Sequence, residues 1–180
     1  QPTWHSQGRY LAWIEWDHPN MPWDGTRVML ARLAGSPPRV SEAQVIGGGP
    51  DTPAGQPLFS PDGHWLAFIE GGEEWQNLVL VDLSSGERRI LLTGDGFDLM
   101  PPAWVQGVRS LAWSPDGQSL YSIRSANGLS SLWRVGLDGR CEMLDLAPYT
   151  WLAQLSVSSR GKLALLAAGP VTPTRLIVIE

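Results

Sequence analysis

The chain repeats one stretch, Phe59-Ser-Pro-Asp-Gly63-His-Trp-Leu-Ala-Phe-Ile69, as Trp113-Ser-Pro-Asp-Gly117-Gln-Ser-Leu-Tyr-Ser-Ile123. Proline sets φ for the first central position of a type I turn, and aspartate suits the second position. Glycine accepts the left-handed conformation that follows. Each stretch therefore predicts a tight turn that leads into a β-strand.

Two weaker copies of this pattern lie at the ends of the chain. They are His5-Ser-Gln-Gly8-Arg-Tyr-Leu-Ala-Trp-Ile14 and Val157-Ser-Ser-Arg-Gly161-Lys-Leu-Ala-Leu-Leu166, which lack Pro-Asp but keep the glycine and the apolar strand. The four glycines are separated by 55, 54 and 44 residues. Such spacing indicates a repeat architecture, with approximate units 1–50, 51–100, 101–150 and 151–180.

Further strand-like runs follow each turn. The third strands are expected at Arg27 to Leu33, Asn77 to Leu83, Ser131 to Val135 and Arg175 to Glu180, and fourth strands at Arg88 to Leu92 and Cys141 to Leu144. The run from Trp65 to Ile69 is apolar on both faces, so both faces of its sheet must be covered. The expected fold is all-β, a partial β-propeller of about four blades, each of about four antiparallel strands. We expect most of the ten tryptophans to fill the wedges between sheets.

The composition of the chain indicates which kinds of partner and which cellular location to expect. The chain carries 13 basic and 18 acidic residues, for a net charge of -5, and no basic stripe, so we expect no nucleic-acid partner. No apolar run approaches the length of a membrane span, so we expect no membrane partner. Cys141 has no second cysteine with which to form a disulfide, and a cytoplasmic location is the default expectation. The chain opens at Gln1 and stops in a strand-like run, so we expect a fragment of a longer chain.

No complete catalytic machinery is visible in the sequence. A hydrolase nucleophile elbow needs Gly-x-Ser-x-Gly between a strand and a helix. The nearest approach, around Ser119, lacks the second glycine and is interpreted as a strand. The three histidines show no metal-site spacing, and His5 and His64 are expected to be exposed turn residues. We therefore expect no catalytic residue, no cofactor and no metal in this chain.

One loop is unusually apolar for its position. The run from Glu15 to Thr26 combines two tryptophans, two prolines and a methionine with His18. Its apolar side chains need a surface to pack against, either their own blade or another domain, and a self-packed loop that closes a blade is an equal alternative. The candidate substrate or domain-interface residues are Trp16, Asp17, His18, Asn20, Met21, Trp23 and Asp24. Glu73 and Glu74 are candidates to contact a substrate amine, although an acidic pair in a glycine-flanked loop is usually only solvated.

The run from Glu15 to Thr26 resembles the propeller domain of bacterial prolyl oligopeptidase family serine peptidases, in the acylaminoacyl-peptidase or dipeptidyl-aminopeptidase-like branch. The Ser-Pro-Asp-Gly units are also similar to repeats in TolB-like propellers. In the family, a propeller of seven or eight blades caps a C-terminal α/β-hydrolase domain with a Ser-Asp-His triad. None of the triad residues has a counterpart here.

This resemblance implies a propeller segment that gates and helps select peptide substrates for a serine exopeptidase. The expected partners are the α/β-hydrolase domain of the parent chain and a peptide substrate. The alternative is a TolB-like or WD-repeat-like interaction module with no enzymatic parent. A partial ring also leaves apolar sheet faces uncovered, so a homodimer of the fragment is a further expectation.

Overall fold

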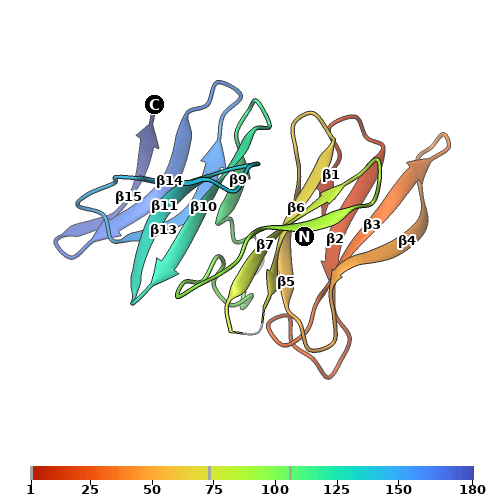
Figure 1. Ribbon diagram of the computed structural model, residues 1–180, viewed down its shortest axis with the longest axis horizontal. Helices are drawn as coiled ribbons and strands as arrows, with labels where there is room; N and C mark the ends of the chain where they lie inside the picture. Colours follow the sequence, from red (N-terminus) through yellow and green to blue (C-terminus); the bar gives the residue numbers. More distant parts are fainter. Residues whose placement is uncertain (1, 73, 106) are drawn as a thin grey trace.

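The computed structural model describes residues 2–72, 74–105 and 107–180. Within these residues the chain is all-β and contains no helix: fifteen strands form four antiparallel sheets (Figure 1). The first three sheets have four strands and the fourth has three, and each sheet follows the order of the chain. The predicted fold class is thus confirmed at the level of all-β architecture built from repeated antiparallel sheets.

The first sheet contains β1 (Thr3–Trp4), β2 (Tyr10–Glu15), β3 (Arg27–Ala34) and β4 (Arg39–Gly48). The second sheet contains β5 (Ala54–Phe59), β6 (Trp65–Gly71), β7 (Gln76–Asp82) and β8 (Arg88–Leu92). The third contains β9 (Leu111–Trp113), β10 (Ser119–Ala126), β11 (Leu129–Gly136) and β12 (Cys141–Leu144), and the fourth contains β13 (Trp151–Val157), β14 (Leu163–Gly169) and β15 (Thr172–Ile179).

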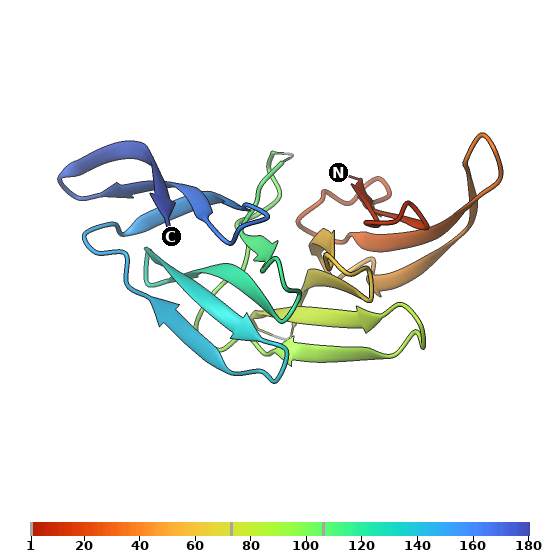
Figure 2. The same ribbon diagram turned by 90° about the horizontal axis from the view of Figure 1, so that it is seen from above.

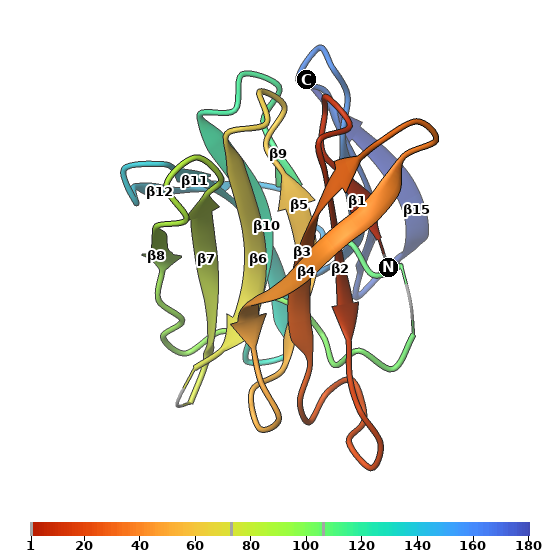
Figure 3. The same ribbon diagram turned by 90° about the vertical axis from the view of Figure 1, so that its right-hand side faces the viewer.

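The four sheets stand side by side around an open arc. Figure 2 shows the arc from above, with the N-terminus on its concave side and the C-terminus in the sheet at one end. The first strands of neighbouring sheets contact one another, β1 with β5, β5 with β9 and β9 with β13. Figure 3, viewed along the long axis, shows β6 and β10 lying one behind the other. This is the arrangement of sheets in a partial propeller.

The repeated turn adopts the predicted geometry. In the second sheet, Gly63 has a φ of 74°, and its N–H donates to the Ser60 carbonyl at 2.9 Å. The Ser60 hydroxyl donates to Asp62 at 2.5 Å and accepts the Trp65 N–H at 2.9 Å. Ser, Asp and Gly therefore form a closed unit that reverses the chain into β6.

Strand β6 is covered on both faces, as its composition predicted. Leu66 and Phe68 pack against the first sheet, whereas Ala67 and Ile69 pack against the third, and all four have 0% exposure. Side chains alternate between the two faces of a strand. Each fully buried large aliphatic or aromatic side chain contributes about 1.5–3 kcal/mol. A third cluster joins the third and fourth sheets through residues that include Ile123 and Leu165.

The prediction that most tryptophans lie in the core is wrong. Only Trp113 is buried, and the six exposed tryptophans are Trp4, Trp16, Trp23, Trp75, Trp104 and Trp151. The space between sheets is filled instead by leucine, valine, isoleucine, alanine and Phe68. Facing sheets lie about 10 Å apart, and side chains of this size interdigitate at that distance.

The prediction of an exposed turn histidine holds for His64 but is wrong for His5. The side chain of His64 is 72% exposed. The imidazole of His5 is buried, because it inserts between the first and second sheets and lies against Tyr10 and Phe59. Over the described parts of the chain, no helix is long and apolar enough to cross a membrane.

Candidate functional site

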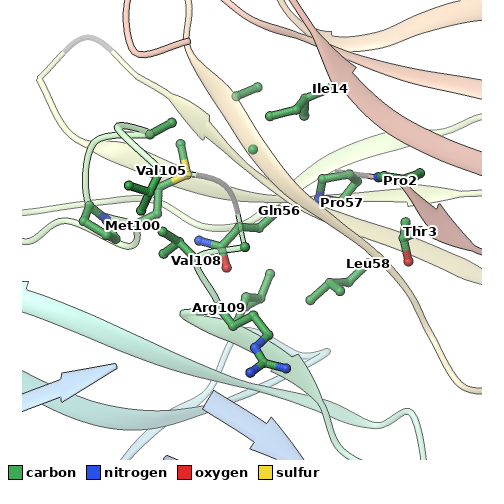
Figure 4. A pocket seen from close by; sticks show the side chains of 16 residues that line it. Pro2, Thr3, Ile14, Gln56, Pro57, Leu58, Met100, Val105, Val108 and Arg109 are labelled. Atoms are coloured by element: carbon green, nitrogen blue, oxygen red, sulfur yellow. The ribbon is translucent and has the colours of Figure 1, made fainter. Parts of the chain in front are cut away.

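The concave side of the arc contains an apolar pocket of about 160 Å³ (Figure 4). We call it the wall pocket. It lies where β5 meets β9 and residues 100–105 and 107–109, and β1 and β2 close one side. Its apolar lining includes Ile14, Pro57, Leu58, Val108 and Leu111. The wall pocket is thus a hollow of mainly hydrophobic character in the inner wall of the arc.

A β-bulge in β5 shapes one side of the wall pocket. The pairing of β5 with β6 shifts register between Gly55 and Leu58, and Gln56 adopts a φ of 53°. The bulge directs the Gln56 side chain toward the third sheet. There the Gln56 amide nitrogen donates to the Ser110 hydroxyl at 2.8 Å, and its amide oxygen accepts the Ser110 N–H at 2.8 Å. Strand β5 is therefore joined, beside the pocket, to the residue that precedes β9.

Met100 forms another side of the wall pocket and is fixed through its backbone. The Gln76 side-chain oxygen accepts the N–H groups of Leu99 and Met100 at 2.8 and 2.7 Å. The Gln76 side-chain nitrogen donates to the Met100 carbonyl at 3.1 Å. A Cβ at Gly55 would lie 3.0 Å from the Met100 sulfur, so glycine at this position lets the methionine lie against β5. The pocket wall is pre-organised by these contacts.

Arg109 is the charged residue among those that line the wall pocket. It is exposed, and its Nε donates to the Gln154 side-chain oxygen at 3.1 Å. The Arg109 carbonyl accepts the Leu155 N–H at 2.8 Å, which ties its backbone to β13. The guanidinium is therefore held at the rim between the third and fourth sheets.

The loop predicted as a candidate site lies elsewhere, between β2 and β3. The Asn20 side chain donates to the Pro50 carbonyl at 2.5 Å, and the Thr26 hydroxyl donates to the Ala54 carbonyl at 2.9 Å. Arg27 pairs with Asp17 at 2.7 Å. These contacts fold the loop onto the connection between the first and second sheets.

The apolar side chains of this loop stay open to solvent in the described chain. Trp16 is 40% exposed, Met21 46% and Trp23 38%. His18 is also exposed, and Asp24 accepts the Met21 N–H within the loop at 3.0 Å. A small hollow of about 60 Å³ lies between Trp16, Asn20 and Pro50. The loop is therefore anchored to its own sheets by the Asn20 and Thr26 side chains, while its two tryptophans and its methionine stay exposed.

Of the acidic pair, Glu74 is exposed and lines neither hollow, and Glu73 lies outside the described residues. Ser119 occupies the first position of β10, where it is buried and accepts a hydrogen bond from Arg134 Nε at 2.9 Å. Its interpretation as a strand residue is confirmed. In the described part of the chain, no three histidine, cysteine or acidic side chains gather as a metal site.

Sequence reasoning missed Gln56, Met100 and Arg109. A signal for Gln56 was present, because Gln56, Ser110 and Gln154 each stand four residues before the serine that begins a repeat turn. The structure brings these three positions to the inner wall, where Gln56 bonds to Ser110 and Gln154 bonds to Arg109. No comparable pattern marks Met100.

Comparison with solved structures shows which proteins this chain resembles. The chain is similar over 99% of its length to puromycin hydrolase, with 27% identity and a TM-score of 0.87, and it covers 26% of that protein's chain. It matches TolB from Acinetobacter baumannii with 17% identity and a TM-score of 0.71, covering 99% of this chain and 40% of TolB. It matches a prolyl endopeptidase with 18% identity and a TM-score of 0.68, and the match covers 99% of this chain and 24% of the endopeptidase chain.

The arrangement of sheets and these similarities define a β-propeller segment. The resemblance predicted from the sequence is confirmed, since the chain resembles the propeller domain of the prolyl oligopeptidase family. It spans about a quarter of the length of puromycin hydrolase. No protein-family model matches the sequence. No curated protein matches it.

Proposed function

We propose that the chain is a propeller segment that gates and helps select peptide substrates for a serine exopeptidase. Each of the four sheets is one blade, and the catalytic α/β-hydrolase domain lies outside these 180 residues. The observation that carries the proposal is the similarity to puromycin hydrolase, at 27% identity over 99% of this chain. The wall pocket supports it, because a ligand hollow on the inner wall lies where a peptide would pass.

The physical basis of gating is steric. A wall of packed sheets cannot yield without losing its inter-sheet core, so it excludes substrates that are wider than the opening. Side chains on the inner wall then favour some peptides over others by differences in binding free energy. In this proposal the propeller supplies selection, and the partner hydrolase domain supplies the nucleophile.

The first test is the gene beyond Glu180. A downstream Gly-x-Ser-x-Gly motif, followed by an aspartate and a histidine with hydrolase spacing, is the expected result. A stop codon soon after Glu180 would overturn the proposal and favour the TolB-like interaction module.

The second test is enzymatic. The 180-residue chain should not hydrolyse aminoacyl or acyl-aminoacyl chromogenic esters, whereas the full gene product should. Robust hydrolysis by the 180-residue chain would place the chemistry within it and contradict the proposed division of roles.

A further inference from the structure

We infer that the wall pocket binds the C-terminal residue of a short peptide, with an apolar side chain inside the pocket and the free carboxylate on Arg109. The inference rests on the proposed substrate-selecting role and names the substrate class for that same inner wall. Three properties of the pocket carry it: its size, the chemistry of its lining, and the state of the guanidinium at its rim.

The size of the wall pocket limits the occupant to a single side chain. Its volume is about 160 Å³. A cavity of about 150 Å³ lined by aliphatic and aromatic groups holds a benzene ring, whereas pockets for drug-sized ligands measure about 300–1,000 Å³. The wall pocket therefore fits a side chain of the size of leucine or phenylalanine rather than a longer stretch of peptide.

The lining selects for an apolar side chain. Leu111 and Met100 line the pocket and are buried, and the partly buried Leu58 and Val108 also line it. Figure 4 shows Met100 and Val108 on one side of the pocket and Leu58 on another. The amide of Gln56 is already engaged by Ser110 on both of its polar atoms. A basic side chain placed in this pocket would lose its hydration without gaining a partner, at a cost of several kcal/mol.

Arg109 supplies the complementary charge at the rim. Its Nε donates to Gln154, and within the described residues neither Nη atom of this exposed side chain has a hydrogen-bond partner. No acidic side chain among the described residues lies within ion-pair distance of it. A guanidinium binds a carboxylate with two parallel N–H···O bonds. A peptide whose last residue is apolar carries both required groups on one Cα.

The experiment titrates three tripeptides into the isotopically labelled 180-residue chain and follows backbone amide chemical shifts. The probes are Gly-Gly-Leu, its C-terminal amide, and Gly-Gly-Ser. The free acid should bind about fivefold more tightly than the amide, the size of an exposed ion pair. Gly-Gly-Leu should bind about tenfold more tightly than Gly-Gly-Ser. The largest shifts should map to β5 and the segment 107–111.

Matched variants test whether the peptide carboxylate binds to the Arg109 side chain. Arg109→Met should bind the acid and the amide equally, whereas Arg160→Met, at an exposed turn arginine of the fourth sheet, should keep the fivefold difference. Val108→Phe should reduce the preference for leucine over serine. Thermal melting of each variant checks that it is folded, and the acid and amide comparison in the unchanged chain needs no variant at all.

Equal affinity for acid and amide in the unchanged chain would overturn the inference. So would a difference that persists in Arg109→Met, or the absence of any shift at the wall pocket at millimolar peptide. Failure of this inference can be told apart from failure of the proposed function. Binding without a downstream hydrolase in the gene would refute the exopeptidase role alone, and a downstream hydrolase without binding would refute this substrate class alone.

Discussion

At the scale of the residue, His5 joins the first two sheets through its Nε2, while its Nδ1 bonds within its own turn. Its Nδ1 accepts the Gln7 N–H at 3.0 Å, so the proton is on Nε2, which donates to the Gly63 carbonyl at 3.0 Å. His5→Ala should lower the free energy of unfolding by about 2–4 kcal/mol, because it leaves a cavity and an unpaired buried carbonyl. Urea denaturation measures the change. His64→Ala is the matched control, expected to cost less than about 0.5 kcal/mol because its side chain is exposed; equal losses would contradict the interpretation.

Asp116 gives the turn of the third sheet a dependence on pH. The hydroxyl of Ser114 and then the N–H of Gln118 donate to its carboxylate, which lowers the pKa of Asp116 below its usual value of 3.8. The stabilisation is therefore fully present above pH 3.8 and is lost as the pH falls through the folded-state pKa. Asp116→Asn should cost about 1 kcal/mol at pH 7. The gap between the two proteins should narrow as the pH falls below 3.8 in denaturant titrations, and a gap independent of pH would refute this account.

At the scale of the element, the bulge of β5 holds the second and third sheets together. Gln56→Ala removes both hydrogen bonds to Ser110 and leaves a buried N–H unpaired, so it should destabilise the chain by about 1–3 kcal/mol. Gln56→Gly loses the same bonds but relieves a φ of 53°, so it should be more stable than Gln56→Ala by about 1 kcal/mol. Thermal melting of the two variants tests both statements. An Ala variant as stable as the unchanged chain would show that the bridge contributes nothing.

The elements were predictable where local chemistry decides them. The Ser-Pro-Asp-Gly turns and the doubly apolar strand β6 could be read directly, because turn geometry and two-sided burial each leave a pattern in neighbouring residues. The bulges at Gln56 and Gln154 were not predicted, since a bulge depends on what the partner strand and the next sheet offer. The burial of His5 was missed for the same reason, because its acceptor Gly63 is 58 residues away.

At the scale of the whole molecule, the wall pocket shows a further limit of sequence reasoning. Its lining comes from three of the four sheets and the connections between them, so residues far apart in the chain meet there. Sequence composition instead indicated the loop from Trp16 to Asp24 as the candidate site, because its tryptophans and prolines lie close together in the sequence. The structure places that loop at the connection of the first two sheets and places the wall pocket farther along the arc.

The outer face of the fourth sheet leads to a prediction about association. Along β15, Ile177 and Ile179 pack toward the third sheet, while Leu176 and Val178 point away and are 68% and 62% exposed. β15 is also an edge strand with unpaired backbone groups on one side. Apolar faces and open edges both favour association. The 180-residue chain should therefore self-associate at tens of micromolar in sedimentation velocity runs.

Two lysines introduced on that face test whether association occurs through the fourth sheet or through nonspecific apolar contacts elsewhere. Leu176→Lys combined with Val178→Lys should shift the chain to monomer, because each new ammonium group would lose its hydration in a face-to-face contact. Leu129→Lys is the matched control, since Leu129 is 56% exposed but is the first residue of β11 in the third sheet. It should leave association unchanged. A monomeric profile for the unchanged chain, or association that survives the double variant, would show that the fourth sheet does not mediate the contact.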